Sequence, residues 1–266
     1  MSQLIKELPW DSNHFKVKIG RYLPTTIADP DQEKSFRQEF FAGKFDCVYA
    51  MLDASDVHSR EAAARNQFFL GDIRMSYALT KKDWFPKEPQ RRQGTIPAEI
   101  RFLNPDNAEQ VAQVKVLSRD LSVVSRFHFD ERFRPYVADM YEIWAGNFIK
   151  PKTPTDLPVK TVIALKNGWV AGFIGNKIVE EEKDGQKVRH GEVVLVATHS
   201  DFRGQGFGRA MSEKSIDWCF EQGAEFVTVD TQGNNYQASR LYESVGFRLQ
   251  DMKLIYHVWK QYGFNK

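Results

Sequence analysis

Hydrophobic residues recur along this chain with two different periods. Residues 193–197 form an apolar, mostly β-branched run, which predicts a buried strand. Beyond a glycine-rich segment, Phe207, Met211 and Trp218 recur at helical spacing up to Gly223, which predicts a helix with one apolar face. The pattern therefore predicts a strand, a tight turn and a helix in direct succession.

From residue 99 onward the same periods predict a strand, two helices, three antiparallel strands, a helix, a strand, a helix and a last strand. The first two of the three antiparallel strands form a predicted hairpin around Asn167-Gly168. The predicted ranges, in this order, are 99–103, 106–118, 134–148, 159–165, 169–179, 188–198, 207–222, 225–230, 235–245 and 253–259.

The first 80 residues predict a smaller α/β unit. Its predicted strands are 16–22, 45–52 and 73–79, and its predicted helices are 31–42 and 60–69. Residues 81–98 carry prolines, a glycine and many charges, a composition typical of a linker. We therefore predict an α/β (α+β) protein with a small N-terminal domain at 1–90 and a second domain at 95–266.

Composition narrows the class of protein without naming a function. The 266 residues are 42% hydrophobic and 27% charged, which is typical of a globular protein with a sizeable core. A net charge of +2 gives no support for nucleic acid or a membrane surface as a partner. No apolar run reaches transmembrane length, and residues 1–11 lack the apolar centre of a signal peptide.

The cysteines and histidines bear on compartment and metal content. Cys47 and Cys219 lie in apolar-patterned segments, which predicts buried free thiols and a cytoplasmic location. The six histidines are scattered without the spacing of metal ligands, so we expect no metal.

The glycine-rich segment at 203–208, Arg-Gly-Gln-Gly-Phe-Gly, has the features of an anion site. Glycine amides can point into one concavity, and the N-terminus of the following helix adds partial positive charge. A P-loop would end Gly-Lys-Ser/Thr, but residues 208–210 are Gly-Arg-Ala, and a dinucleotide-binding loop would need a third glycine at Arg209. The remaining alternative at this point is a turn that only lets the helix pack closely on its strand.

Two motifs resemble the GNAT family of acyl-CoA-dependent N-acetyltransferases. The segment at 203–208 resembles the R-x-x-G-x-G pyrophosphate loop of that family, and residues 235–247 resemble its N-x-x-A-x-x-L-Y-x-x-x-G-F segment. The resemblance implies a GNAT fold with a central mixed, mostly antiparallel sheet, and acetyl-CoA as cosubstrate. The order of elements predicted from residue 99 onward agrees with this fold.

The resemblance also implies roles for residues on the acetyl-CoA side. The end of the strand before the loop would pair with the pantetheine arm, and an N–H near Val196 would face the thioester oxygen. Amides of the loop would bind the pyrophosphate, Arg203 and Arg209 would add charge, and Asn235 would bond the pantetheine or the loop. The implied cofactor-binding residues are Leu195, Val196, Ala197, Arg203, Gly204, Gln205, Gly206, Phe207, Gly208 and Asn235.

The same resemblance implies an acid and a base. Tyr242 would be the general acid for the leaving thiolate, although it could equally extend the apolar stripe of its helix. Glu192 matches the position of the glutamate base in histone-type GNAT enzymes, and its alternative role is that of an exposed strand-end acid. Cys219 lies inside an apolar helix pattern and is a poor nucleophile candidate, so we expect direct transfer in a ternary complex.

Two polar-aromatic segments, 10–15 and 125–130, are candidates for binding the acceptor. An arginine flanked by aromatic residues with an acid nearby suits a ligand with a flat ring and phosphates. The alternatives are a side-chain-capped turn in the first segment and a loop fixed by an Arg126–Asp130 ion pair in the second. The candidate substrate-binding residues are Trp10, Asn13, Phe15, Arg126 and Asp130.

A narrower resemblance rests on W-D-x-x-x-F from Trp10, S-R-F from Ser125 and Thr231-Gln232 ahead of Asn235. These features are similar to the dTDP-4-amino-4,6-dideoxygalactose N-acetyltransferases, which implies a nucleotide-linked amino sugar as acceptor. The resemblance also implies that Asp72 lies near the acceptor and takes the proton of its amine, directly or through water. Its alternative role is that of a turn residue after Gly71.

The chain also departs from that group of enzymes. Its hairpin around 180–190 is extended and there are extra residues at 151–158, so the identity of the sugar stays open. A GNAT enzyme for a peptide, a protein or a small amine, and an acyl-CoA-binding sensor without catalysis, are the alternative functions. The oligomeric state is also open, with a homodimer among the possibilities.

Overall fold

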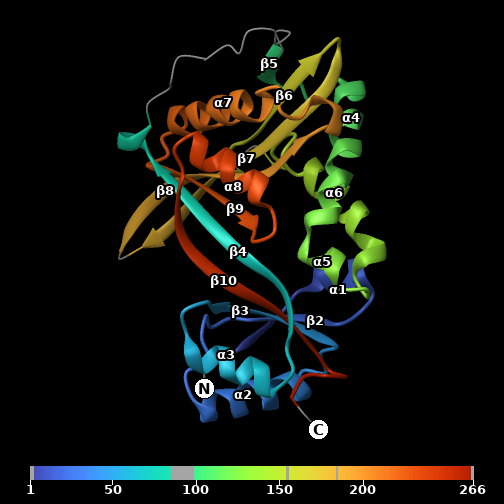
Figure 1. Ribbon diagram of the computed structural model, residues 1–266, viewed down its shortest axis with the longest axis vertical. Helices are drawn as coiled ribbons and strands as arrows, with labels where there is room; N and C mark the ends of the chain where they lie inside the picture. The colour runs from blue at the N-terminus through green and yellow to red at the C-terminus, as the bar shows by residue number, and fades with distance from the viewer. Residues whose placement is uncertain (1–2, 85–98, 154–155, 184, 265–266) are drawn as a thin grey trace.

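The computed structural model describes residues 3–84, 99–153, 156–183 and 185–264. Over these residues ten strands form one sheet in the order β1-β2-β3-β10-β4-β9-β8-β7-β6-β5 (Figure 1). Neighbouring strands run antiparallel, except that β2 and β3 are parallel and so are β8 and β9. The strands are β1 Ile5–Glu7, β2 Ile19–Tyr22, β3 Cys47–Asp53, β4 Phe69–Thr80, β5 Glu99–Phe102, β6 Val159–Lys166, β7 Trp169–Lys183, β8 Gln186–Thr198, β9 Phe226–Gln232 and β10 Arg248–Trp259.

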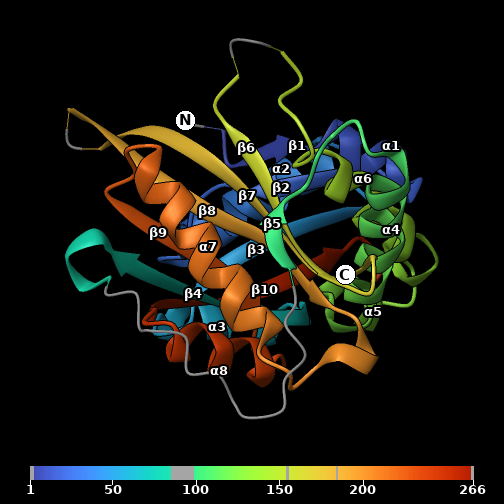
Figure 2. The ribbon, with the colours of Figure 1, turned by 90° about the horizontal axis from the view of Figure 1, so that it is seen from above.

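Helices cover this sheet in separate groups. One face carries α4 and α6, and the opposite face carries α7 and α8 (Figure 2). At the other end of the molecule α2 and α3 lie beside β1–β3 (Figure 1). The helices are α1 Pro9–Phe15, α2 Pro30–Ala42, α3 Val57–Arg65, α4 Ala108–Ser118, α5 Arg126–Phe129, α6 Val137–Gly146, α7 Phe207–Glu221 and α8 Tyr236–Ser244.

Three apolar cores correspond to these groups of helices. The core under α4 and α6 is rich in aromatic side chains, including Phe15, Phe127 and Phe133. The core under α7 and α8 includes Met211 and Trp218, two of the residues whose spacing predicted the helix. A third core joins α2 and α3 to β3 and β10. The sheet is therefore packed on both faces, which explains its long runs of buried apolar residues.

Local sequence signals explain most of the element boundaries. The Asp29 and Asp56 side chains accept hydrogen bonds at the N-termini of α2 and α3, as N-cap residues do. Asn167 and Gly168 have φ values of 54° and 82°, which is the turn expected between β6 and β7. The structure thus confirms the hairpin predicted there.

The N-terminal elements differ from the prediction in four places, the first of which is the unpredicted strand β1 at Ile5–Glu7. Residues 9–15 form helix α1, which Pro9 begins and Lys16, with a φ of 62°, ends, so that β2 starts only at Ile19. Helix α3 is shorter than predicted because Gln67, with a φ of 53°, is left-handed. Strand β4 starts at Phe69, so Gly71 and Asp72 lie within the strand and not in a turn before it.

Strands β4 and β10 link the two ends of the molecule. β10 lies between β3 and β4, and β4 pairs in turn with β9 (Figure 1). Strands on both sides of the predicted domain boundary therefore belong to one sheet. The predicted linker falls largely on residues 85–98, outside the described residues, and the division into two domains stays a prediction.

Candidate active site

The glycine-rich loop has the conformation of an anion site. Gly204 and Gly206 have φ values of 73° and 87°, a region that favours glycine. Gly206 is the N-cap of α7, and its carbonyl accepts the first helical hydrogen bond, from the Ala210 N–H at 3.1 Å. The amides just before Ala210 lie in the first turn, where no carbonyl precedes them in the helix. They are therefore available to a ligand at the positive end of a 15-residue helix.

Strands β8 and β9 separate directly before this loop. They pair only over His190–Val193 and Phe226–Val229, whereas β7 accompanies β8 as far as Thr198. A bulge at Val194 marks the start of the separation. The part of β8 that contains Leu195, Val196 and Ala197 thus turns an unpaired backbone edge toward β9. Such an edge can pair with an extended ligand.

Three cations surround the loop and differ in how they are held. Arg203 is exposed, and its Nε donates to the Thr198 carbonyl at 3.1 Å. Arg209 is bonded to Glu213 at 2.9 Å and to the Ser244 carbonyl. Lys166, at the end of β6, donates from Nζ to Oε1 of Gln205 at 2.6 Å. The sequence analysis missed Lys166 because it precedes its partner by 39 residues.

Helix α8 places Tyr242 beside this opening. The Asn235 side chain caps α8 by accepting from the Ala238 N–H at 3.3 Å. Tyr242 is 4% exposed, and its ring centroid lies 6.0 Å from that of Tyr77 on β4. Burial, with Asp230 as a further cause, raises the pKa of the Tyr242 hydroxyl. The phenol therefore stays protonated at neutral pH, which is the form that a proton donor needs.

Asp230 is a second residue beside this opening that the sequence analysis did not single out. It directly follows Val229, the last residue of β9 that pairs with β8. Its carboxylate is exposed and forms an ion pair with Arg74 on β4. The strand pattern offered no reason to separate Asp230 from other solvent-facing strand residues.

The two candidate bases lie in different places. Glu192 pairs across the sheet with Thr228, which in turn pairs with Ala78, and the carboxylate of Glu192 contacts Lys177 at 2.6 Å. Asp72 lies six residues along β4 from Ala78, which corresponds to about 20 Å at the rise of a strand. One amine therefore cannot contact both carboxylates.

Asp72 has an environment suited to proton exchange. Desolvation raises the pKa of its carboxyl to about 6, although the N–H groups of Ile73 and Gly233 and the charge of Arg126 act in the opposite direction. The Ile73 N–H donates to Oδ1 at 2.7 Å. Asp72 lies five residues along β4 from Tyr77, about 16 Å at the rise of a strand. A direct contact with an amine beside Tyr242 would therefore require an extended acceptor or intervening water.

Arg126 occupies the centre of a cluster of polar and aromatic residues. Its guanidinium carbon lies 4.6 Å from the ring centroid of Tyr49 and 4.3 Å from that of Phe127. Burial raises the pKa values of Asp11 and Asp72, and the positive charge of Arg126 acts in the opposite direction on both. Within the described ranges no carboxylate lies within ion-pair distance of Arg126. The guanidinium is thus stacked on rings and accessible to an anionic ligand.

Asp130 lies in the core behind Arg126. It is 2% exposed and contacts Arg132 at 3.4 Å, while Oδ2 accepts from Trp259 Nε1 at 2.7 Å and lies 3.0 Å from His257 Nδ1. The Arg126–Asp130 ion pair considered as an alternative from the sequence is therefore not formed. Asp130 organises the wall of this region from inside.

The three residues of the first acceptor segment fall on different sides of α1. Trp10 is 42% exposed and stacks on His14 with ring centroids 5.0 Å apart, and it also contacts Trp144. Asn13 is exposed, whereas Phe15 is buried against Phe127 and Phe133. The structure thus brings Trp10 to the surface on the helix that carries Asp11, and it places Phe15 in the core.

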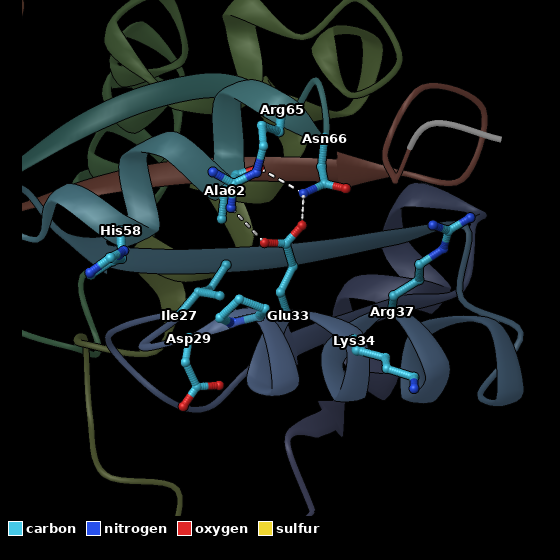
Figure 3. Close-up of a pocket in the computed structure, with 10 residues that line it drawn as sticks. Ile27, Asp29, Glu33, Lys34, Arg37, His58, Ala62, Arg65 and Asn66 are labelled. Atoms are coloured by element: carbon cyan, nitrogen blue, oxygen red, sulfur yellow. Dashed lines mark hydrogen bonds and ion pairs between the residues drawn. The ribbon is translucent and has the colours of Figure 1, made fainter.

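One cavity lies away from these residues. It has a volume of about 580 Å³ and opens between α2 and α3 (Figure 3). Inside it Glu33 accepts hydrogen bonds from Arg65 at 2.8 Å and from Asn66 at 2.6 Å. None of the predicted site residues lines this cavity. A smaller pocket of about 260 Å³ is lined by Leu70, Gly71, Asp72, Ile73, Phe129, Gly233 and Asn234.

Cysteine, metal and membrane features complete the description. Cys47 and Cys219 are buried free thiols, and burial raises the pKa of Cys219 to about 12. Neither thiol has the exposed, electropositive setting of a nucleophile. Among the described residues no group of histidine, cysteine and acidic side chains has the arrangement of a metal site. None of the helices in the described ranges combines the length and hydrophobicity needed to cross a bilayer.

The fold is that of the GNAT acetyltransferases. The structure of a GCN5-related N-acetyltransferase from Sphaerobacter thermophilus matches with a TM-score of 0.62 and 13% identity, over 96% of this chain and 76% of that one. A tandem GNAT protein from the clavulanic acid biosynthesis pathway matches with a TM-score of 0.57 and 12% identity, over 91% and 75%. Residues 124–247 match the model of the acetyltransferase (GNAT) family. This match covers a little under half of the chain, and together with the fold it indicates a GNAT N-acetyltransferase.

Two relatives differ in how much of the chain they match. The mycothiol acetyltransferase of Nocardiopsis dassonvillei is 34% identical over 94 residues, which is 34% of this chain and only 28% of that protein. The spore coat polysaccharide biosynthesis protein SpsD of Bacillus subtilis is 21% identical over 263 residues, covering 96% of this chain and 83% of that protein. The stronger similarity thus covers only about a third of the chain, and the full-length similarity is weak.

Proposed function

We propose that this protein is an acetyl-CoA-dependent N-acetyltransferase that acts on the amino group of a nucleotide-linked amino-deoxy sugar. One observation supports acetyl-CoA as the cosubstrate. The pairing of β8 with β9 ends at Val193, ahead of the glycine-rich loop that leads into the N-terminus of α7. A thioester ligand has the two parts that this arrangement suits: an amide-bearing arm and a pyrophosphate. Backbone edges and helix N-termini bind such groups without any side-chain requirement.

In this proposal the protein holds both reactants, removes a proton from the amine and gives a proton to the departing thiolate. The free edge of β8 near Val196 orients the thioester and stabilises the oxyanion that forms when the amine attacks. Tyr242 gives its proton to the departing thiolate. Cys219 takes no part, so the acetyl group passes directly from sulfur to nitrogen.

The acceptor side is assigned to the cluster around Arg126. A guanidinium stacked on Tyr49 without a carboxylate partner suits a phosphate of the acceptor. The exposed Trp10 ring suits a flat base, with Asn13 beside it. Asp72 takes the proton of the amine through water, and Glu192 is the competing base. The position of Asp72 in the pocket beside α5 favours Asp72.

The full-length relative supports this acceptor only in a general way. SpsD is described as a spore coat polysaccharide biosynthesis protein, which is compatible with a sugar substrate. Other relatives match only part of the chain, such as the N-alpha-acetyltransferase 30 of Schizosaccharomyces pombe, 28% identical over 90 residues. An acceptor of the peptide class is therefore the alternative.

A panel of acceptors tests the proposal. Purified protein is incubated with acetyl-CoA and dTDP- or UDP-linked 3-amino and 4-amino deoxy sugars, N-terminal peptides and polyamines, and products are identified by mass spectrometry. We expect transfer of one acetyl group to an amino sugar nucleotide and not to the peptides. Transfer to peptides alone would reassign the acceptor, and acetyl-CoA binding without transfer to any acceptor would indicate a sensor.

A further inference from the structure

A small pocket at the start of β4 contains the candidate base. Its volume of about 260 Å³ corresponds to roughly eight waters at about 30 Å³ each. It is therefore large enough for one sugar ring. Leu70, Ile73 and Phe129 give it an exposed apolar rim, and Asp72 lies among them. Helix α5, which carries Phe129, lies beside this part of β4 (Figure 1).

His257 on β10 lies behind the wall of this pocket and has a fixed tautomer. Its Nδ1 is 3.0 Å from Oδ2 of Asp130, which also accepts from Trp259. Because an ionised carboxylate only accepts hydrogen bonds, Nδ1 carries the hydrogen and Nε2 presents a lone pair. Burial lowers the pKa of His257 to about 4, so the ring is neutral at pH 7.

The lone pair of His257 has no partner among the described residues. The side chain is 0% exposed, and Nε2 makes no hydrogen bond. The hydroxyl of Tyr49, the residue that pairs with His257 across β3 and β10, is also buried without a partner. The two rings are 5.3 Å apart. Buried polar groups are nearly always satisfied, so two orphans on neighbouring residues need an explanation.

Gly71 connects these orphan groups to the pocket. It lines the pocket, and a Cβ added to it would lie 3.2 Å from both Nε2 and Cε1 of His257. It is also the extra residue of a β-bulge, since Asp72 pairs with Ile255 and Leu70 with Tyr256. Bulges loosen a ladder locally and are common beside active sites. A small outward movement of Gly71 would open the pocket to Nε2.

We infer that His257 and Tyr49 form a hydroxyl-binding subsite of the acceptor pocket, with Nε2 accepting from a hydroxyl of the acceptor and Tyr49 donating to it. A hydroxyl both donates and accepts, so it matches the two unused groups together. The inference rests on the proposed function for the presence of an acceptor in this pocket. It makes His257 a residue that selects acceptors bearing a hydroxyl on the part of the acceptor that lies in this pocket.

Matched variants of His257 separate binding from structure. Asparagine places its amide where Nδ1 lies, so His257→Asn keeps the bond to Asp130 and removes the acceptor at Nε2. Glutamine reaches the position of Nε2 and loses the bond to Asp130. With dTDP-4-amino-4,6-dideoxygalactose as acceptor, we expect His257→Asn to raise the acceptor KM about tenfold and His257→Gln to raise it less. The KM for acetyl-CoA should not change in either variant.

Tyr49→Phe tests the subsite without changing the histidine, and Gly71→Ala tests it by placing a methyl group against the histidine ring. Tyr49→Phe keeps the ring that packs against Arg126 and should raise the acceptor KM several-fold. Gly71→Ala fills the space beside Nε2 and should do the same. If the histidine matters only for packing, His257→Gln should be the worse of its two variants, melting temperature should fall, and Tyr49→Phe should leave the acceptor KM unchanged. That pattern would overturn the inference.

A direct measurement does not depend on catalysis. In protein with ¹⁵N-labelled histidine, the Nε2 resonance of His257 should move upfield when dTDP-4-amino-4,6-dideoxygalactose is added without acetyl-CoA. Acetyl transfer without this change would refute the subsite and leave the proposed function standing. The change without transfer would support the subsite and refute the assigned reaction, and the absence of both would refute both.

Discussion

Replacing Asp72 by asparagine should make the protein more stable at neutral pH and leave its stability nearly unchanged at acid pH. The pKa of this carboxyl is raised from 3.8 to about 6 in the folded protein, mainly by desolvation. The folded state therefore holds the proton more tightly than the unfolded chain does. Asparagine keeps an oxygen for the Ile73 N–H, which donates to Oδ1 at 2.7 Å, and removes the charge.

The sign of the effect follows from proton linkage. Below about pH 4 the carboxyl is protonated in both states and contributes nothing. Between pH 4 and 6 the unfolded chain loses the proton first, so stability falls as the pH rises, and above pH 6 the full cost of the buried charge is present. At about 1.36 kcal/mol for each pKa unit the limit is about 3 kcal/mol. Because Asp72 is half-buried, solvent screening reduces the expected gain to about 1–2 kcal/mol.

Urea unfolding at pH 3.5 and pH 7.5, followed by circular dichroism, measures this difference. The exposed Asp106, replaced by asparagine, serves as the control and should change stability at neither pH. Asp72→Asn should also lose activity, and with it the rise of rate near pH 6. Equal stability of wild type and Asp72→Asn at pH 7.5, or an equal gain at both pH values, would refute the reasoning about Asp72.

Four further outcomes follow from the acetyl-CoA side. Tyr242→Phe should lower kcat about 100-fold with unchanged acetyl-CoA affinity by calorimetry, and an equal loss of both would contradict the role as acid. Gly206→Ala adds a Cβ that meets no described atom within 4 Å, so its cost of about 1–2 kcal/mol should come from the positive φ alone and appear as a lower melting temperature and a higher acetyl-CoA KM. Lys166→Met should weaken acetyl-CoA binding about threefold to tenfold and reduce its dependence on salt, and unchanged salt dependence would exclude a phosphate contact. Cys219→Ala should retain its turnover in steady-state assays, whereas loss of activity in a folded variant would point to an acetylated cysteine.

The acetyl-CoA half was predictable from sequence because its determinants are local. The strand, the glycine loop and the helix occupy 186–221, and the residues that follow bring α8 back beside α7. Glycines at 204 and 206 adopt the left-handed conformation that their spacing suggested. Side chains distant in sequence, such as Lys166, could not be assigned to the loop from the sequence. A single lysine at the end of a strand is common on protein surfaces and does not indicate a binding site.

The acceptor half was less predictable because its contacts are long-range. Asp130 meets His257 across 127 residues, and no local pattern links them. From sequence Asp72 read as a turn residue after Gly71, whereas the structure places both inside β4, where the bulge is created by pairing with β10. Helix α1 was missed although Pro9 stands at its first position, since seven residues carry too little periodicity to reveal a helix.

The position of β10 between β3 and β4 sets the order in which the molecule can fold. Lys253 on β10 bonds to Asp53, 200 residues earlier, so β3 and β4 keep open edges until the end of the chain arrives. Contacts of such separation slow folding, and exposed strand edges favour aggregation in the meantime. The loop and α7 precede β10 in the chain, so the acetyl-CoA side can form first. The wall of the pocket around Asp72 includes residues packed against His257, so it can be complete only after β10 has paired.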